Sequence, residues 1–90
     1  MPLQILSSPS AARDITGELE RAISAAFSGA TIEVRAKSPG HFEIRVVSAS
    51  FAEQNRVTQQ QRVYAAIAHL MKGDEAPVHA IDRLHTETPS

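Results

Sequence analysis

Histidine is the residue type in this chain with the clearest chemical potential, because its ring nitrogens bind metals and exchange protons near neutral pH. The 90-residue sequence contains four histidines and no cysteine, so it can supply imidazole ligands but neither thiolates nor a disulfide. His79 and His85 lie six residues apart. In an unbroken strand they would share one face at a separation of about 20 Å, too far to bind one metal ion together. The carboxylates show no metal-binding spacing, so we do not expect a zinc site built by this chain alone.

No arrangement of side chains typical of an enzyme active site is present in the sequence. There is no cysteine nucleophile, no Gly-x-Ser-x-Gly turn and no glycine-rich phosphate loop. Residues 28–30 are better interpreted as a helix stop, and Glu18, Glu20 and Arg21 as part of a solvated helix face. The sequence therefore predicts a non-enzyme.

The composition sets limits on partners and location. Nine Lys and Arg against ten Asp and Glu give a formal net charge of -1, whereas nucleic-acid binders usually carry a basic excess. No apolar run approaches the roughly 20 residues of a membrane helix, and the N-terminus shows no charged-then-apolar signal pattern. We expect a cytoplasmic protein without a membrane partner, with a flexible arm over residues 1–13 and a single domain over residues 14–90.

Apolar residues at helical spacing predict two helices. The first begins after Asp14, a suitable N-cap, and is stopped by Gly29. The second spans residues 58–72, and Thr58 with Gln61 has the spacing of a capping box. The expected buried stripes contain Ile15, Leu19, Ala22, Ile23, Ala26 and Phe27 in the first helix and Val63, Ile67, Leu70 and Met71 in the second.

Between the helices, two alternating runs predict an antiparallel hairpin. Residues 31–36 and 42–47 alternate in polarity, and Pro39-Gly40 suits the centre of a type II turn. Opposite charges should face one another across the strands, because each such pair contributes about 0.2–1 kcal/mol. The charges therefore select the register that pairs Val34 with Ile44, Glu33 with Arg45 and Arg35 with Glu43. In this register His41 lies in the connecting loop.

A final strand is expected to start near Val78. Ile81 and Leu84 are three positions apart, which breaks strict alternation. A β-bulge near residues 82–83 would return Leu84 to the core face. The order helix–strand–strand–helix–strand predicts an α+β fold, in which a three-stranded sheet is covered on one face by two helices.

Several segments together resemble the BolA-like family. They are HFEIRVVSASF at residues 41–51, RV at 56–57, RVY at 62–64, VHA at 78–80 and TP at 88–89, and the resemblance runs from about Ile15 to Pro89. It implies a type II KH-like fold with the order αββαβ. It also implies a non-enzymatic accessory protein that pairs with a monothiol glutaredoxin in iron–sulfur cluster assembly, trafficking or iron regulation, with His79 as a cluster ligand.

His41 is the second ligand candidate, because it is expected in the hairpin loop. A histidine directly before Phe is itself common in the family, and a role as a strand cap is the alternative. The sequence also departs from the family here. Family members that share clusters usually place a His or Cys deeper in this loop, where this chain has residues 37–40. In the implied arrangement, a [2Fe–2S] cluster is shared with the glutaredoxin and glutathione, which supply thiolates. Imidazole can replace thiolate on one iron of such a cluster. The isolated chain is expected to bind no cluster.

An alternative interpretation is a KH-like nucleic-acid-binding module that regulates transcription, for example in a stress response, through Arg56 and Arg62. Two departures from the family weaken phosphate binding in this reading. Glu53 stands where the family often has glycine, and residues 59–61 are glutamines where it often has Arg-His-Arg. A third interpretation is a diverged domain that binds a protein partner without metal.

Overall fold

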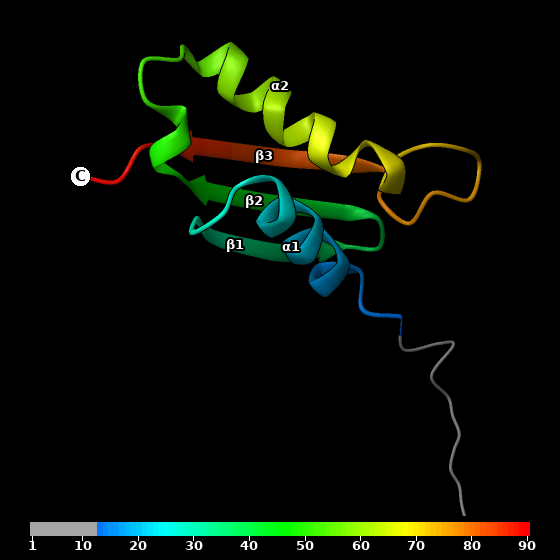
Figure 1. Ribbon diagram of the computed structural model, residues 1–90. Helices are drawn as coiled ribbons and strands as arrows, with labels where there is room; N and C mark the ends of the chain where they lie inside the picture. The colour runs from blue at the N-terminus through cyan, green and yellow to red at the C-terminus, as the bar shows by residue number, and fades with distance from the viewer. Residues whose placement is uncertain (1–12) are drawn as a thin grey trace, which may run out of the picture.

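The computed structural model describes residues 13–90, so the arm predicted over residues 1–13 lies almost entirely outside the described residues. Within residues 13–90 the chain forms an α+β fold with one three-stranded sheet, as predicted (Figure 1). No helix in this part of the chain has the length and apolarity needed to span a membrane. The elements in chain order are α1 (Ile15–Ala26), β1 (Thr31–Ser38), β2 (His41–Val47), η3 (Ala49–Phe51), α2 (Arg56–Ile67), η4 (Ala68–Leu70) and β3 (Ala80–Glu87).

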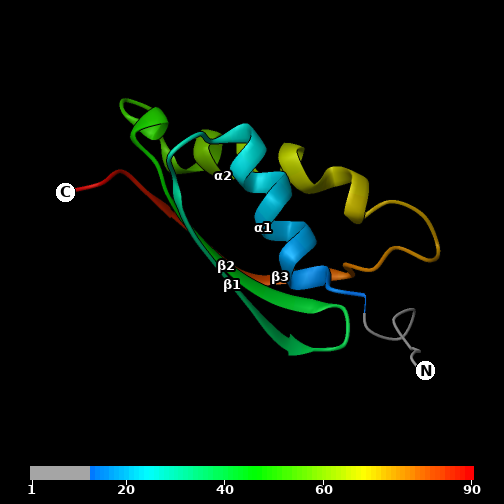
Figure 2. The same ribbon diagram turned by 60° about the horizontal axis from the view of Figure 1, so that its bottom comes forward.

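The sheet has the strand order β1-β2-β3, with β1 antiparallel to β2 and β3 parallel to β2. A parallel pair requires a crossover connection, which α2 supplies between β2 and β3. Figure 2 shows α1 and α2 on the same face of the sheet, and no helix of residues 13–90 covers the opposite face. The predicted arrangement, with both helices on one face, is therefore confirmed.

The hairpin has the predicted register. Gly40 has a φ of 80°, as expected for the third residue of a type II turn. His41 lies in β2 rather than in the connecting loop, because the turn is tighter than predicted and Ser38 already pairs with His41. The confirmed partners are Val34 with Ile44, Glu33 with Arg45 and Arg35 with Glu43.

The bulge predicted in the last strand is also present. Ile81 pairs with Phe42 and Arg83 with Glu43, so Asp82 is the extra residue. The strand begins at Ala80 rather than near Val78. Val78 donates its backbone N–H to the Leu70 carbonyl at 3.1 Å, and this bond holds it against η4 and outside the sheet.

The sequence predicted the N-cap of α1 correctly but not that of α2. Asp14 caps α1 as predicted, accepting a hydrogen bond from Gly17 N at 2.9 Å. The predicted Thr58 cap of α2 is wrong. Asn55 is the N-cap and accepts from Thr58 N at 2.8 Å, so that Thr58 lies inside the first turn. The helix ends at Ile67, before the predicted residue 72, and continues as the 3₁₀ turn η4.

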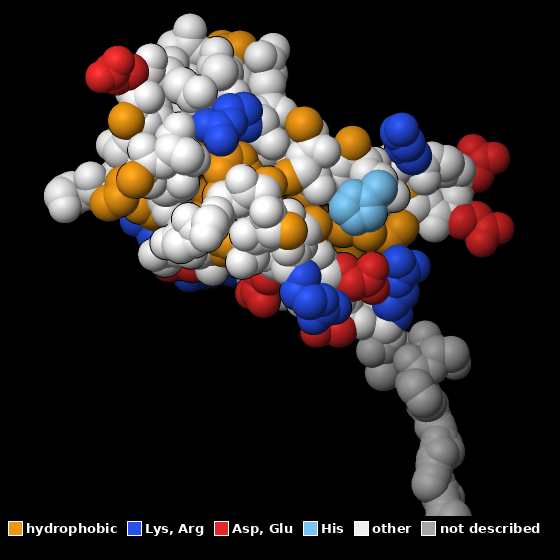
Figure 3. All heavy atoms as spheres, viewed as in Figure 1, with side chains coloured by type: hydrophobic (Ala, Val, Ile, Leu, Met, Phe, Trp, Pro, Cys, Tyr) orange, Lys and Arg blue, Asp and Glu red, His pale blue; other side chains and the backbone are white. Residues whose placement is uncertain are grey.

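The core lies between the two helices and the sheet. Ala26, expected in the buried stripe of α1, is instead exposed. Figure 3, which views the helical face, shows hydrophobic side chains between the helices and charged side chains mainly at the margins. The buried hydrophobic residues are Leu19, Ile23, Phe27, Phe42, Ile44, Val46, Phe51, Val63, Ile67, Leu70 and Val78.

Candidate metal-ligand site

The β1–β2 turn and the segment leading into β3 lie at the same end of the sheet (Figure 1). The Gly40 carbonyl joins them, because it accepts hydrogen bonds from His79 N at 2.8 Å and from Ala80 N at 3.1 Å. These two bonds fix the backbone of His79 directly beside the hairpin turn. His79 itself is exposed, and within residues 13–90 its ring nitrogens form no hydrogen bond.

Gly40 also shapes the space that the His79 ring occupies. A Cβ atom built on Gly40 would lie 2.8 Å from both Cγ and Nδ1 of His79, closer than real Cβ atoms approach. The ring therefore rests where any other residue would place its side chain. Gly40 serves two purposes, since its positive φ also makes the tight turn.

His41 is brought close to His79 by backbone pairing. His41 is the partner of Ala80 across β2 and β3, and Ala80 follows His79 directly. Its Nδ1 atom lies 3.0 Å from Oδ1 of Asp82, and the two side chains are 40% and 43% exposed. Because side chains alternate along a strand, His41 shares the helix-free face with Glu43. The two candidate imidazoles thus start from neighbouring backbone positions.

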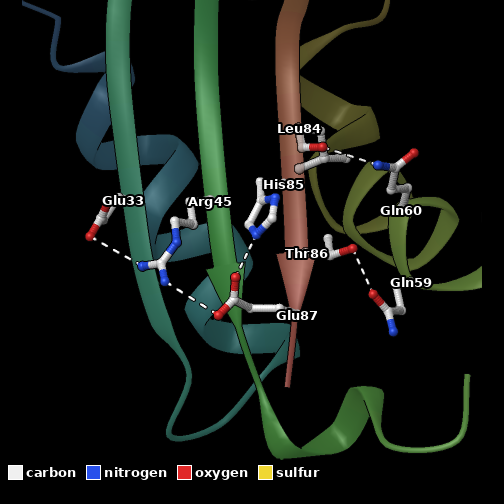
Figure 4. Close-up of polar contacts among 8 residues, drawn as sticks. All are labelled: Glu33, Arg45, Gln59, Gln60, Leu84, His85, Thr86 and Glu87. Carbon is white, nitrogen blue, oxygen red and sulfur yellow. Dashed lines mark hydrogen bonds and ion pairs between the residues drawn. The ribbon is translucent and has the colours of Figure 1, made fainter. Parts of the chain in front are cut away.

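The other two histidines lie elsewhere. His69 is in η4 and exposed. His85 hydrogen-bonds Glu87 on the helix-free face (Figure 4). In the part of the chain that the structure describes, no three His, Cys, Asp or Glu side chains gather as a metal site.

The helix-free face carries a network of opposite charges, part of which Figure 4 shows. Arg45 lies 3.4 Å from Glu33 and 3.4 Å from Glu87. The hydrogen bond from His85 is the main cause that lowers the pKa of Glu87 below its usual range, and the charge of Arg45 acts in the same direction. Exposed pairs of this kind contribute little to stability.

The two arginines of the nucleic-acid interpretation differ in environment. Arg56 is exposed at the start of α2. The guanidinium of Arg62 instead lies 4.9 Å from the ring centroid of Phe27, and it donates hydrogen bonds to the Ser50 carbonyl and to Gln54 Oε1 at 2.8 Å each. Arg62 therefore joins η3 to both helices, and these contacts leave it little freedom to bind a phosphate.

Two glutamines of α2 attach this helix to the outer edge of β3 (Figure 4). Gln60 donates its side-chain N–H to the Leu84 carbonyl at 3.0 Å, and Gln59 accepts from the Thr86 hydroxyl at 2.7 Å. The family often has basic residues here, but in this chain both side chains are directed to the sheet rather than to a ligand.

Glu53 occupies the position where the family often has glycine. Its φ is 65°, in the left-handed region, and its side chain is exposed. We expect Glu53→Gly to raise the free energy of unfolding by about 1 kcal/mol, because the left-handed strain of roughly 1–2 kcal/mol exceeds the entropic cost of glycine. Urea denaturation would measure it. Ala52→Gly, at a φ of -55°, should instead destabilise, and equal losses in both variants would contradict the prediction.

Two residues that help to form this site were not identified as such from the sequence. The sequence pattern predicts only a turn at Gly40 and only a bulge near Asp82. The signal for Asp82 was its place as the extra residue in the strand, but the sequence did not reveal that it would meet His41. The signal for Gly40 was the Pro-Gly pair alone, which says nothing of a neighbour across the sheet.

Comparisons with known proteins agree with this fold. A family model described as BolA-like protein matches residues 21–90. BolA1 from Mus musculus is 25% identical with a TM-score of 0.69, and the match covers 99% of this chain and 77% of that one. A bolA homologue from Coxiella burnetii is 28% identical with a TM-score of 0.63, over 82% of this chain and 90% of its own.

The BolA domain of SufE1 from Arabidopsis thaliana is 17% identical with a TM-score of 0.70, and the match covers 94% of this chain and 96% of that domain. At that identity the likeness shows the fold alone. No curated protein matches the sequence. Because the family model matches most of the chain, the protein belongs to the BolA-like family.

Proposed function

We propose that this protein is a non-enzymatic accessory protein that shares a [2Fe–2S] cluster with a monothiol glutaredoxin. The observation that carries the proposal is the state of His79. Its backbone is fixed by two hydrogen bonds to Gly40, while its ring is exposed and without a hydrogen-bond partner in the described residues. A fixed backbone with a free imidazole suits a ligand that must meet a metal held by another molecule.

The chain's donors suit a shared cluster rather than a self-contained site. The sequence has no cysteine, so thiolates must come from the partner and from glutathione. His79 would supply one imidazole and His41 a second, a donor set that replaces thiolate on one iron in Rieske-type clusters. The cluster is then cargo that passes between proteins, in cluster assembly, trafficking or the regulation of iron.

The test is to mix the protein anaerobically with a monothiol glutaredoxin loaded with a [2Fe–2S] cluster and to follow visible absorption and circular dichroism. Wild type should change the spectrum, and His79→Ala should abolish that change because it removes the nitrogen ligand. His69→Ala is the matched control, since it removes an exposed histidine in η4 and should behave as wild type.

Two results would contradict the proposal. An unchanged spectrum with wild type would exclude cluster sharing with that partner, and equal spectra for wild type and His79→Ala would exclude His79 as a ligand. Thermal unfolding of each variant must accompany the spectra, so that loss of fold is not mistaken for loss of a ligand.

A further inference from the structure

Asp82 stands outside the regular pairing of β2 with β3. Ile81 is the partner of Phe42 and Arg83 the partner of Glu43, so that Ile81 and Asp82 together face one residue of β2. A bulged residue is free of the ladder and its side chain takes a direction that regular pleating would not give. In this case the side chain meets His41.

The residues after Asp82 explain why the bulge forms at this position. In an unbroken ladder, Asp82 would face Glu43 and two like charges would oppose each other. Arg83 would then face Ile44, which is buried. With the bulge, Arg83 faces Glu43 and Leu84 faces Ile44. The position of Asp82 is therefore set by the core and by its neighbours' charges.

The contact between Asp82 and His41 selects one form of the imidazole ring. Nδ1 of His41 lies 3.0 Å from Oδ1 of Asp82. An ionised carboxylate can only accept, so Nδ1 must carry the proton and donate it. In the neutral ring, the lone pair is then on Nε2, which points away from the carboxylate. Metal-binding histidines are commonly oriented in this way, by a carboxylate on the other ring nitrogen.

We propose that Asp82 is a positioning residue that prepares Nε2 of His41 to bind the shared cluster. The proposal rests on the proposed function, because it assigns a role to Asp82 through His41 as the second ligand. It also explains how a histidine at the start of β2, rather than deeper in the hairpin loop, is held for this role.

A second histidine–carboxylate pair, in β3, serves as a comparison for His41 and Asp82. His85 also bonds a carboxylate, Glu87, but through Nε2. Its neutral ring should therefore have the lone pair on Nδ1, the opposite tautomer to that of His41. The His41–Asp82 and His85–Glu87 pairs both lie on the exposed, helix-free face, so a difference in tautomer between the two histidines would not be caused by a difference in solvent exposure.

The first experiment measures the tautomers directly. Long-range proton–nitrogen NMR spectra of the free protein should be recorded at pH 8.5, above the ordinary histidine pKa of about 6.5. His41 should carry its proton on Nδ1 and His85 on Nε2. Asp82→Ala should shift the His41 equilibrium toward Nε2–H, whereas Glu87→Ala should affect only His85. A wild-type His41 protonated on Nε2 would overturn the proposal.

The second experiment uses the glutaredoxin carrying the [2Fe–2S] cluster. Asp82→Ala should weaken the cluster-dependent complex roughly 10- to 100-fold, the usual effect of losing such a carboxylate. Asp82→Asn, which keeps an acceptor oxygen, should lose less. In a His41→Ala background, Asp82→Ala should have no further effect, because the two residues act as one unit.

Deletion of Asp82 is the second variant, because it removes the carboxylate while leaving every other β2–β3 partner in place. It should weaken the complex as Asp82→Ala does. If His79→Ala abolishes the spectral change but both Asp82 variants equal wild type, Asp82 has no positioning role and the proposed function stands. If wild type itself leaves the spectrum unchanged, the proposed function and this role both fall.

Discussion

Replacing Gly40 with alanine should displace the His79 ring and, if the proposed cluster sharing holds, abolish the expected spectral change almost as completely as His79→Ala. The added Cβ would lie 2.8 Å from Cγ and Nδ1 and 3.3 Å from Cβ of His79. The ring must move, because the Gly40 carbonyl holds the His79 backbone at 2.8 Å. Left-handed strain at Gly40 adds a loss of roughly 1–2 kcal/mol in the free energy of unfolding.

Gly73→Ala is the matched control for this prediction. Gly73 has a φ of 89°, similar to that of Gly40, but a Cβ there would meet nothing within 4 Å. Both variants should therefore lose similar backbone stability in urea denaturation. Only Gly40→Ala should change the His79 ring signals in NMR spectra and the spectrum of the glutaredoxin mixture. If both variants give the wild-type spectrum, the contact with Gly40 does not position His79.

Phe51→Ala should cause the largest loss of stability, about 3–5 kcal/mol, as truncation of a buried aromatic residue typically does. Phe51 is fully buried. Its ring lies 5.1 Å from that of Phe27, and the Arg62 guanidinium lies 5.6 Å from its centroid. A domain of this size has a total stability of roughly 4–12 kcal/mol, so the variant should be partly unfolded at 37 °C.

Urea denaturation with circular dichroism would measure this loss. Phe51→Leu keeps much of the volume and should cost less than about 1.5 kcal/mol. Val57→Ala is the surface control, because Val57 is 64% exposed and should change stability by less than about 0.5 kcal/mol. A cost below about 1 kcal/mol for Phe51→Ala would mean that η3 is not part of the core.

Local patterns predicted the elements well and their boundaries less well. The register of the hairpin followed from cross-strand charges, and the bulge followed from the spacing of Ile81 and Leu84. The start of α2 did not, because the capping-box spacing of Thr58 and Gln61 pointed to a cap three residues too late. Asn55 prevails over Thr58 in the structure. Periodicity locates a helix, but which polar residue caps it depends on where the preceding chain enters.

The candidate ligands were accessible from the sequence only through family resemblance. A histidine at the start of a strand has no local signal that separates a ligand from an exposed side chain. The contributions of Gly40 and Asp82 could not be predicted at all, since each depends on a partner from a distant segment. Arg62 was likewise predicted only as a candidate phosphate-binding residue, and its contacts with Phe27 and the Ser50 carbonyl again depend on segments distant in the sequence.

The chemical role proposed for His79 depends partly on the sequence and partly on the tertiary structure. The sequence by itself determined that the chain offers imidazoles and no thiolates, that it folds as two helices on three strands, and that one strand contains an extra residue. The tertiary structure alone decided that β3 runs parallel to β2 and places His79 on Gly40 and Asp82 beside His41. The physical reason is that parallel pairing depends on how the α2 crossover packs against the sheet. The local periodicity of the sequence does not predict how this helix packs.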